Sequence, residues 1–182
     1  MTVGTGDFEL TMDELRVVAR FVVEAAEEVL PVFEAAHPDD PRPRAAVDAA
    51  WEFVNGAKRT NLQRAAREAA TESGRLAART AGDAAAAAYL HPIAKATQVS
   101  HILRGPASAA RIAELVAADN PEAGDNFVER AKNHATPVLI DVLSRYPNAP
   151  EGKSRVDHLM SKFGLQATRI PLRVRVSRQV GL

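Results

Sequence analysis

The stretch Thr11–Leu30, TMDELRVVARFVVEAAEEVL, indicates the kind of fold that this 182-residue chain adopts. Thr11 and Glu14 form a capping box, because the threonine hydroxyl can accept the third backbone amide of a helix while the glutamate reaches back. The apolar residues that follow recur at steps of three and four: Leu15, Val18, Val22, Ala25 and Val29. This spacing places them on one face of an α-helix.

The composition extends this helical prediction to the rest of the chain. The sequence holds 35 alanines, and only 5% of its residues are aromatic. Alanine is the best helix former, and the residue types that favour strands are sparse before residue 170. We therefore expect an all-α fold, a single Ala-rich bundle of about six to eight helices over residues 1–165. Residues 166–182 are expected to form a short, mobile, Arg-rich C-terminal tail.

Prolines, glycines and capping residues predict where these helices begin and end. Pro31 and Gly105-Pro106 are expected to kink or end helices, because proline lacks the amide hydrogen of a helix interior. Thr60 is expected to begin a helix that Ser73-Gly74 interrupts. Further starts are expected at Asn120-Pro121 and Ser154, with a split at Pro137; these are typical helix-start residues.

Charge and cysteine content exclude several classes of protein. The chain has no cysteine, so it has neither disulfides nor thiolate chemistry. Its formal net charge is zero, but the last 17 residues carry four arginines and no acid, which leaves −4 on residues 1–165. No apolar run approaches the roughly 18 residues of a membrane span, and the N-terminus lacks the pattern of a signal peptide. We expect a cytoplasmic protein that does not bind membranes.

The first candidate site is the turn Pro38-Asp39-Asp40-Pro41-Arg42-Pro43-Arg44. Three prolines restrict the backbone around two acids and two arginines. Arginine forks can bind carboxylate or phosphate groups of a partner, so Asp39, Asp40, Arg42 and Arg44 are candidate partner-binding residues. Alternatively, Asp39 or Asp40 caps the helix that follows and the arginines pair with these acids, so that the turn is purely structural.

The second candidate site follows a run of alanines that ends at Leu90. His91, Lys95 and Gln98 have the spacing of one helix face, with His101 at its edge. These four residues are candidate partner-binding residues, and they could approach an acid such as Asp40. The alternative is an ordinary solvent-exposed helix face.

Other chemistries find little support in the sequence. The five histidines lack the spacing that places two metal ligands on one helix face, and no nucleophile motif is present. Gly152-Lys153-Ser154 is interpreted as a loop and a helix cap, because the first glycine of a phosphate-binding loop is missing. No metal, cofactor or catalytic residue is predicted. The Arg-rich tail leaves open a third interpretation, an accessory nucleic-acid binder, although it has no interleaved aromatic residues.

Two segments resemble a family of immunity proteins from bacterial polymorphic-toxin systems, common in actinobacteria. They are residues 30–47, which hold the Asp-x-Arg-Pro-Arg sequence, and residues 88–103, with His91-Pro92. The resemblance covers roughly residues 8–163. It implies a small, Ala-rich, all-α cytosolic protein that is not an enzyme and that binds and neutralises a protein toxin. Some members carry the label of an exonuclease subunit, which nothing in this sequence supports.

Two functions therefore compete at this point. The resemblance favours an immunity protein. The alternative is a small-molecule or phosphate-ligand site, for binding or for catalysis, built from Asp40, Arg42 and Arg44 together with His91, Lys95 and His101.

Overall fold

A computed structural model describes residues 8–58, 72–149 and 152–165, and within these ranges the chain forms seven α-helices and no β-strand. The helices are α1 (Met12–Ala36), α2 (Arg42–Val54), α3 (Glu72–Ala87), α4 (Ala96–Val116), α5 (Pro121–Asn133), α6 (Pro137–Ser144) and α7 (Arg155–Lys162). The all-α prediction is confirmed. The expected helix start at Thr60 and the Arg-rich tail lie outside the described residues.

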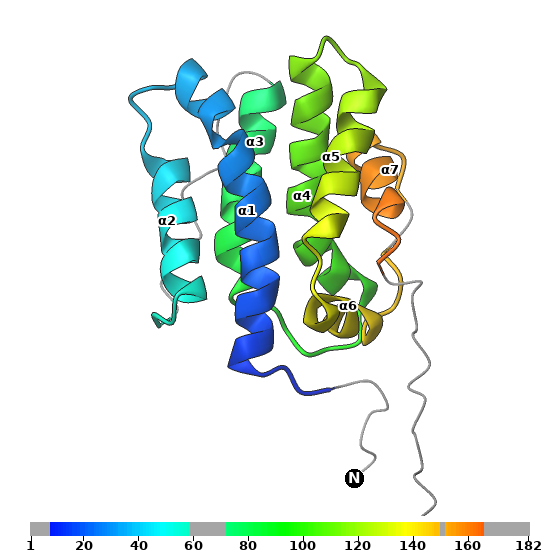
Figure 1. The fold of residues 1–182 in the computed structure, drawn as a ribbon. Helices are drawn as coiled ribbons and strands as arrows, with labels where there is room; N and C mark the ends of the chain where they lie inside the picture. Colours follow the sequence, from blue (N-terminus) through cyan, green and yellow to red (C-terminus); the bar gives the residue numbers. More distant parts are fainter. Residues whose placement is uncertain (1–7, 59–71, 150–151, 166–182) are drawn as a thin grey trace, which may run out of the picture.

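The long helix α1 organises the bundle. It packs against α3 and α4 on its inner side and against α2 on one flank (Figure 1). Helices α5 and α7 cover the other side of α4, and α6 lies across the end where α1 begins. Helices α1, α3 and α4 thus form the centre of the bundle, with α2 on one side and α5 and α7 on the other.

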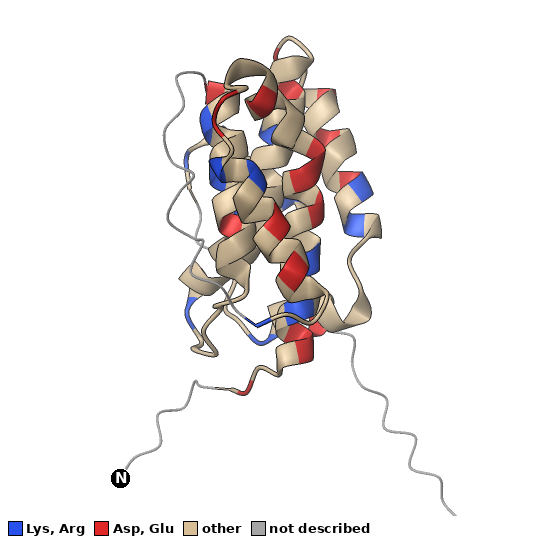
Figure 2. Cartoon of the chain, turned by 90° about the vertical axis from the view of Figure 1, so that its left-hand side faces the viewer, with Lys and Arg blue, Asp and Glu red and all other residues tan. Residues whose placement is uncertain are grey.

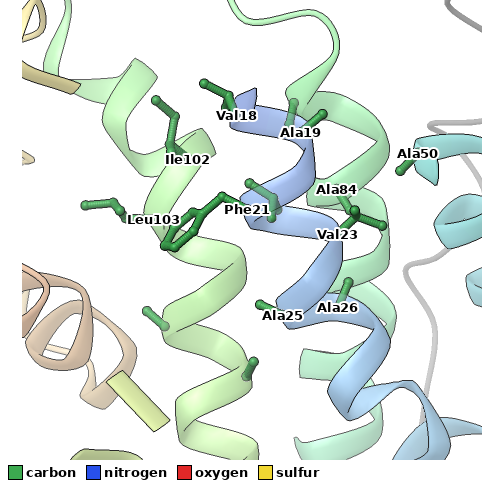
Figure 3. Close-up of a cluster of buried hydrophobic side chains, with 14 of the residues drawn as sticks. Val18, Ala19, Phe21, Val23, Ala25, Ala26, Ala50, Ala84, Ile102 and Leu103 are labelled. Atoms are coloured by element: carbon green, nitrogen blue, oxygen red, sulfur yellow. The ribbon is translucent and has the colours of Figure 1, made fainter. Parts of the chain in front are cut away.

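Small side chains allow the three central helices to approach closely. Every buried residue of α3 is an alanine, a glycine or a threonine. Ala84 of α3 lies close to α1 (Figure 3). Larger side chains of α1 and α4 fill the remaining space, and Phe21 of α1 points toward α4 beside Leu103. The abundance of alanine therefore serves tight helix packing as well as helix propensity.

Neither Pro31 nor Gly105-Pro106 ends a helix, and tertiary packing explains this. Pro31 lies inside α1 on its exposed face, so the disturbed turn opens toward water rather than into the core. Gly105-Pro106 lies within α4, where a Cβ atom on Gly105 would stand 2.8 Å from Val22 Cγ1. This glycine is a close-approach point between α4 and α1, not a helix end. Ser73-Gly74 lies in the first turn of α3, and the helix expected to precede it lies outside the described residues.

Four of the predicted helix starts are confirmed. The Thr11 hydroxyl accepts the Glu14 amide, and the Glu14 carboxylate accepts the Thr11 amide. Asn120 caps α5, and Ser154 caps α7 through a reciprocal bond with Asp157. Pro137 begins a separate helix, α6, as expected. Short polar side chains at these positions satisfy the first backbone amides of each helix.

Candidate functional site

The proline-rich turn joins α1 to α2 and is locked by its own charges. Arg42 forms a bidentate pair with Asp40: Nε lies 2.8 Å from Oδ1, and Nη2 lies 2.6 Å from Oδ2. The Arg42 amide also donates to Asp40 Oδ1 at 3.1 Å. The cap position of α2 is Pro41, so neither Asp39 nor Asp40 occupies it, and Asp40 binds the first helical amide from one residue further out. The expected cap was therefore wrong by one position.

Arg44 points in a different direction from Arg42. Its Nε and Nη2 atoms donate to the two carboxylate oxygens of Glu34, at 2.8 and 2.9 Å, and so tie α2 to α1. The structural alternative for the turn pairs this arginine with Asp39 or Asp40, whereas its partner in the structure is Glu34. Asp39 is exposed and forms no ion pair with the described part of the chain.

These pairs shift the acidities of the turn. The hydrogen bonds from Arg42 lower the pKa of Asp40 to about 2. The bidentate bond from Arg44 lowers the pKa of Glu34, and in return Glu34 raises the pKa of Arg44. Both carboxylates are charged at neutral pH, so the turn presents fixed charges in a rigid frame.

The second candidate segment differs from its prediction. His91 and Lys95 lie in the connection between α3 and α4, and only Gln98 and His101 belong to α4. Gln98 is buried, and its Oε1 accepts the backbone amide of His91 at 3.1 Å. The shared helix face does not exist, because α4 begins only after Lys95. Gln98 positions the connection instead of facing a partner.

The two candidate segments lie at opposite ends of α1 (Figure 1). The Phe8 amide, just before α1, donates to the carbonyl of Pro92 at 3.2 Å, whereas the turn follows the last residue of α1. A 25-residue helix is about 37 Å long at ~1.5 Å per residue. The turn and the His91 connection therefore do not form one site, and His91 does not approach Asp40.

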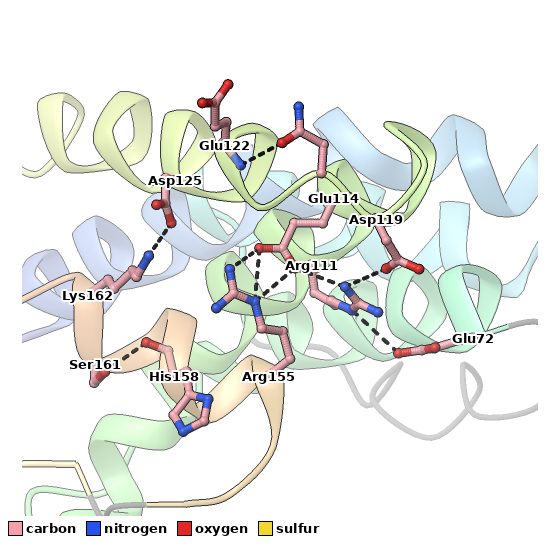
Figure 4. Close-up of polar contacts among 11 residues, drawn as sticks. Glu72, Arg111, Glu114, Asp119, Glu122, Asp125, Arg155, His158, Ser161 and Lys162 are labelled. Atoms are coloured by element: carbon pink, nitrogen blue, oxygen red, sulfur yellow. Dashed lines mark hydrogen bonds and ion pairs between the residues drawn. The ribbon is translucent and has the colours of Figure 1, made fainter.

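Sequence reasoning missed a buried charge network between α4, α5 and α7 (Figure 4). Glu114 of α4 is 1% exposed. Its carboxylate accepts from Arg155 Nε at 3.0 Å and from Arg111 Nη1 at 3.0 Å. Burial alone would raise the pKa of Glu114, but the two guanidinium groups outweigh it and lower the pKa.

The network extends outward from Glu114 to the surface. Arg111 also pairs with Asp119 at 2.9 Å and lies 3.6 Å from Glu72 of α3. On the other side, Lys162 of α7 pairs with Asp125 of α5. The spacing of Arg111 and Glu114 could have signalled the inner pair. Nothing in the sequence could have shown that Arg155, 41 residues away, completes it.

Helix α1 carries the acidic excess of the bundle. It holds six acids and two arginines, a net charge of −4. In the view onto the α2 side, acidic residues follow one another along neighbouring helices (Figure 2). Three of the acids of α1 are paired with groups of other elements: Glu28 with Arg130 at 2.6 Å, Glu24 with His134 at 3.5 Å, and Glu27 with the indole nitrogen of Trp51 at 3.0 Å.

The described residues hold neither a cluster of metal-ligating side chains nor a helix that could cross a membrane. No group of three or more His, Cys, Asp or Glu side chains in these ranges is arranged to hold a metal ion. None of the helices in the described ranges is both long enough and apolar enough to cross a membrane.

The fold and its charged surfaces are those of a small, all-α, Ala-rich protein. Comparison with protein families places it more closely. Residues 9–135, more than half of the chain, match the family described as Imm-5 like putative immunity protein, and the chain belongs to this family. The match includes both candidate segments but ends before α6 and α7, so it is shorter than the resemblance seen in the sequence. No curated protein and no solved structure matched the chain.

Proposed function

We propose that this protein is a non-enzymatic immunity protein of the bacterial cytoplasm that binds and neutralises a protein toxin. Membership of an immunity-protein family, over residues 9–135, is the observation that carries the proposal. A toxin partner follows from that general role. The particular toxin and its activity are not part of the proposal.

The turn between α1 and α2 is the first proposed contact surface. Asp39 and Arg42 are exposed, and the Asp40–Arg42 and Glu34–Arg44 pairs hold the backbone in one arrangement. A surface that is already ordered loses little conformational entropy on binding, which favours affinity. Charged groups of fixed position also steer encounter and exclude wrong partners.

The connection between α3 and α4 is the second proposed contact surface. His91, Lys95 and His101 are exposed there. A standard interface buries about 800 Å² on each partner, and the width of a patch of this area is similar to the length of α1. A toxin that covers both surfaces must therefore bind along the bundle, not at one end.

The separation of the two segments disfavours the competing function. A small-molecule site built from both would require them to meet, and they lie at opposite ends of α1. Nucleic-acid binding through the Arg-rich tail is not favoured either, because residues 1–165 carry a net charge of −4.

The test has two stages. Tagged full-length protein is used to capture partners from its native host, and retained proteins are identified by mass spectrometry. Any retained toxin-like domain is then expressed in a bacterial host with and without this protein. Growth arrest by the domain alone, and growth when both are present, supports the proposal. Arrest that continues despite abundant folded protein, or the absence of any such domain from cells that express the neighbouring genes, contradicts it.

A further inference from the structure

One end of α4 gathers side chains that can carry positive charge. Gln98 and His101 lie three residues apart on α4 and so share a face, and Gln98 holds the backbone of His91. His91 is therefore fixed on the same side of α4 as His101. Arg104 follows His101 by a further three residues and continues the row. We call His91, His101 and Arg104 the histidine surface.

Groups of three other elements lie near this surface: Asp83 of α3, packed beside Gly105, residues of α7, and Tyr146 after α6. On α7, His158 is exposed, and Asp157 lies near enough to Arg104 to feel its charge. The Asp157 carboxylate, however, is committed to the cap of α7, where Ser154 donates to it from its hydroxyl at 2.6 Å and from its amide at 3.0 Å. The Tyr146 hydroxyl donates to the carbonyl of His91 at 3.0 Å and offers no negative charge.

Burial and the neighbouring positive groups both act on the pKa of His101. Partial desolvation, then the charge of Arg104 and then that of His91, lower the pKa of His101 below its usual value of 6.5. Within the described residues, His91, His101 and Arg104 form no ion pair with a carboxylate. An anionic partner would supply the missing countercharge and would favour protonation of His101.

We propose that the histidine surface binds an acidic segment of the partner protein, and that this binding strengthens as the pH falls from 8 to 6. The inference rests on the proposed function, since it names the chemistry of one contact surface of an immunity protein. Carboxylates of the partner remain ionised over this pH range, and their charge favours the protonated form of His101.

A protein segment suits this surface better than a nucleic acid does. The positive groups are few and compact, whereas DNA binding at physiological salt draws on many phosphate contacts. The nearby Tyr146 is buried, so its ring is not available for stacking on a base. Beyond the histidine surface, the acids of α1 would repel a long polyanion.

The test follows the ring protons of the five histidines of full-length protein by NMR, with a glutamate-rich peptide as the probe. We expect the His101 and His91 signals to shift on peptide addition and the pKa of His101 to rise. His134, which pairs with Glu24 on another face, serves as the internal control and should not move. The affinity should fall by up to about a hundredfold between pH 6 and pH 8, the change that one proton taken up on binding over the whole range produces.

Matched variants and competing probes decide the outcome. Arg104→Gln and His101→Gln should each weaken peptide binding severalfold, whereas Arg75→Gln, an exposed arginine on α3, should not. Lys95→Gln provides a further test on an exposed loop residue that does not affect the core. Circular dichroism establishes that each variant is folded.

Three results would overturn the inference. The first is no shift of the His101 signal with the peptide, and the second is an equal shift with inorganic phosphate at a concentration equal to that of the peptide carboxylates. The third is tighter binding of a short DNA duplex than of the peptide. A captured toxin that binds wild-type and Arg104→Gln equally would also overturn it while leaving the immunity role in place. If the peptide binds as expected but no toxin is ever neutralised, the surface stands and the proposed function fails.

Discussion

Arg155 of α7 donates from Nε to both carboxylate oxygens of Glu114 of α4, at 3.0 and 3.1 Å, and Glu114 is almost completely buried. The family match ends at residue 135, so this contact joins a residue beyond the matched region to a buried charge within it. We infer that α7 is an integral part of the bundle, because without Arg155 this buried carboxylate would keep only Arg111 as a partner.

Replacement of Arg155 should destabilise the protein strongly. We expect Arg155→Ala to lower the free energy of unfolding by about 2–4 kcal/mol, because it leaves Glu114 buried with one partner fewer. The measurement is urea unfolding at pH 7. Lys162→Ala is the matched control: it removes an exposed pair with Asp125 on the same helix and should cost less than ~1 kcal/mol. Equal effects of the two variants would show that the buried pair contributes no more to the free energy of unfolding than the exposed pair does.

Gly124→Ala tests the packing of the network against α5. A Cβ atom on Gly124 would lie 2.3 Å from Glu114 Oε1, so alanine must displace the carboxylate from its arginines. Helix propensity alone predicts that this change stabilises α5 by about 1 kcal/mol. We expect the opposite sign, a loss of about 1–3 kcal/mol. Asn126→Ala, at an exposed position of α5, should change stability by less than ~0.5 kcal/mol. A stabilised Gly124→Ala variant would refute the close contact.

Stability should fall in acid, with Glu114 as a major cause. Its pKa is lowered in the folded state, so the native protein binds fewer protons than the unfolded chain does. The contribution is complete above the usual glutamate pKa, near 4.5, and is lost as the pH falls through the lowered native value. We therefore expect Glu114→Gln to be less stable than wild type at pH 7, with a difference that narrows toward pH 3.

The control for this pH dependence is Glu122→Gln. Glu122 is an exposed carboxylate of α5 that forms no ion pair with the described residues. Its difference from wild type should stay small from pH 7 to pH 3. If the Glu114→Gln difference is also constant over this range, the lowered pKa of Glu114 is wrong.

Arg42 should matter for partner binding and little for folding. Its pair with Asp40 is local and exposed, so we expect Arg42→Ala to change stability by less than ~1 kcal/mol. Because the turn is a proposed contact surface, Arg42→Ala should weaken binding of the captured toxin by about tenfold to hundredfold. Arg42→Lys should recover only part of this loss, because lysine lacks the planar fork. Calorimetric titration measures the affinity of both variants for the toxin, and Arg75→Ala is the control. Unchanged affinity for Arg42→Ala would mean that the turn is purely structural.

Local signals in the sequence predicted much of the fold. Thr11 and Glu14, Asn120 with Pro121, and Ser154 begin helices where they were expected to, because a cap acts on amides within three residues of itself. Breaks were predicted less well. Pro31 and Pro106 remain inside helices, since packing against neighbouring helices outweighs the local cost of a proline.

The candidate sites were predicted only in part. The Asp40–Arg42 pair could be anticipated, because its members are two residues apart in a restricted turn. The pairing of Arg44 with Glu34 was not anticipated by either interpretation of the turn, because Glu34 becomes its neighbour only when α2 folds back on α1. His91 and Lys95 were placed on a helix that begins after them, since spacing alone does not locate a helix start.

The sequence by itself determined the all-α class, the helix caps and the kinds of charge that the surface carries, because propensity, capping and charge depend on residues close together in the chain. The tertiary structure alone decided that the turn and the His91 connection lie at opposite ends of α1, and that Arg155 neutralises Glu114 across 41 residues. Such contacts depend on how the helices pack, and packing places residues side by side whatever their separation in sequence.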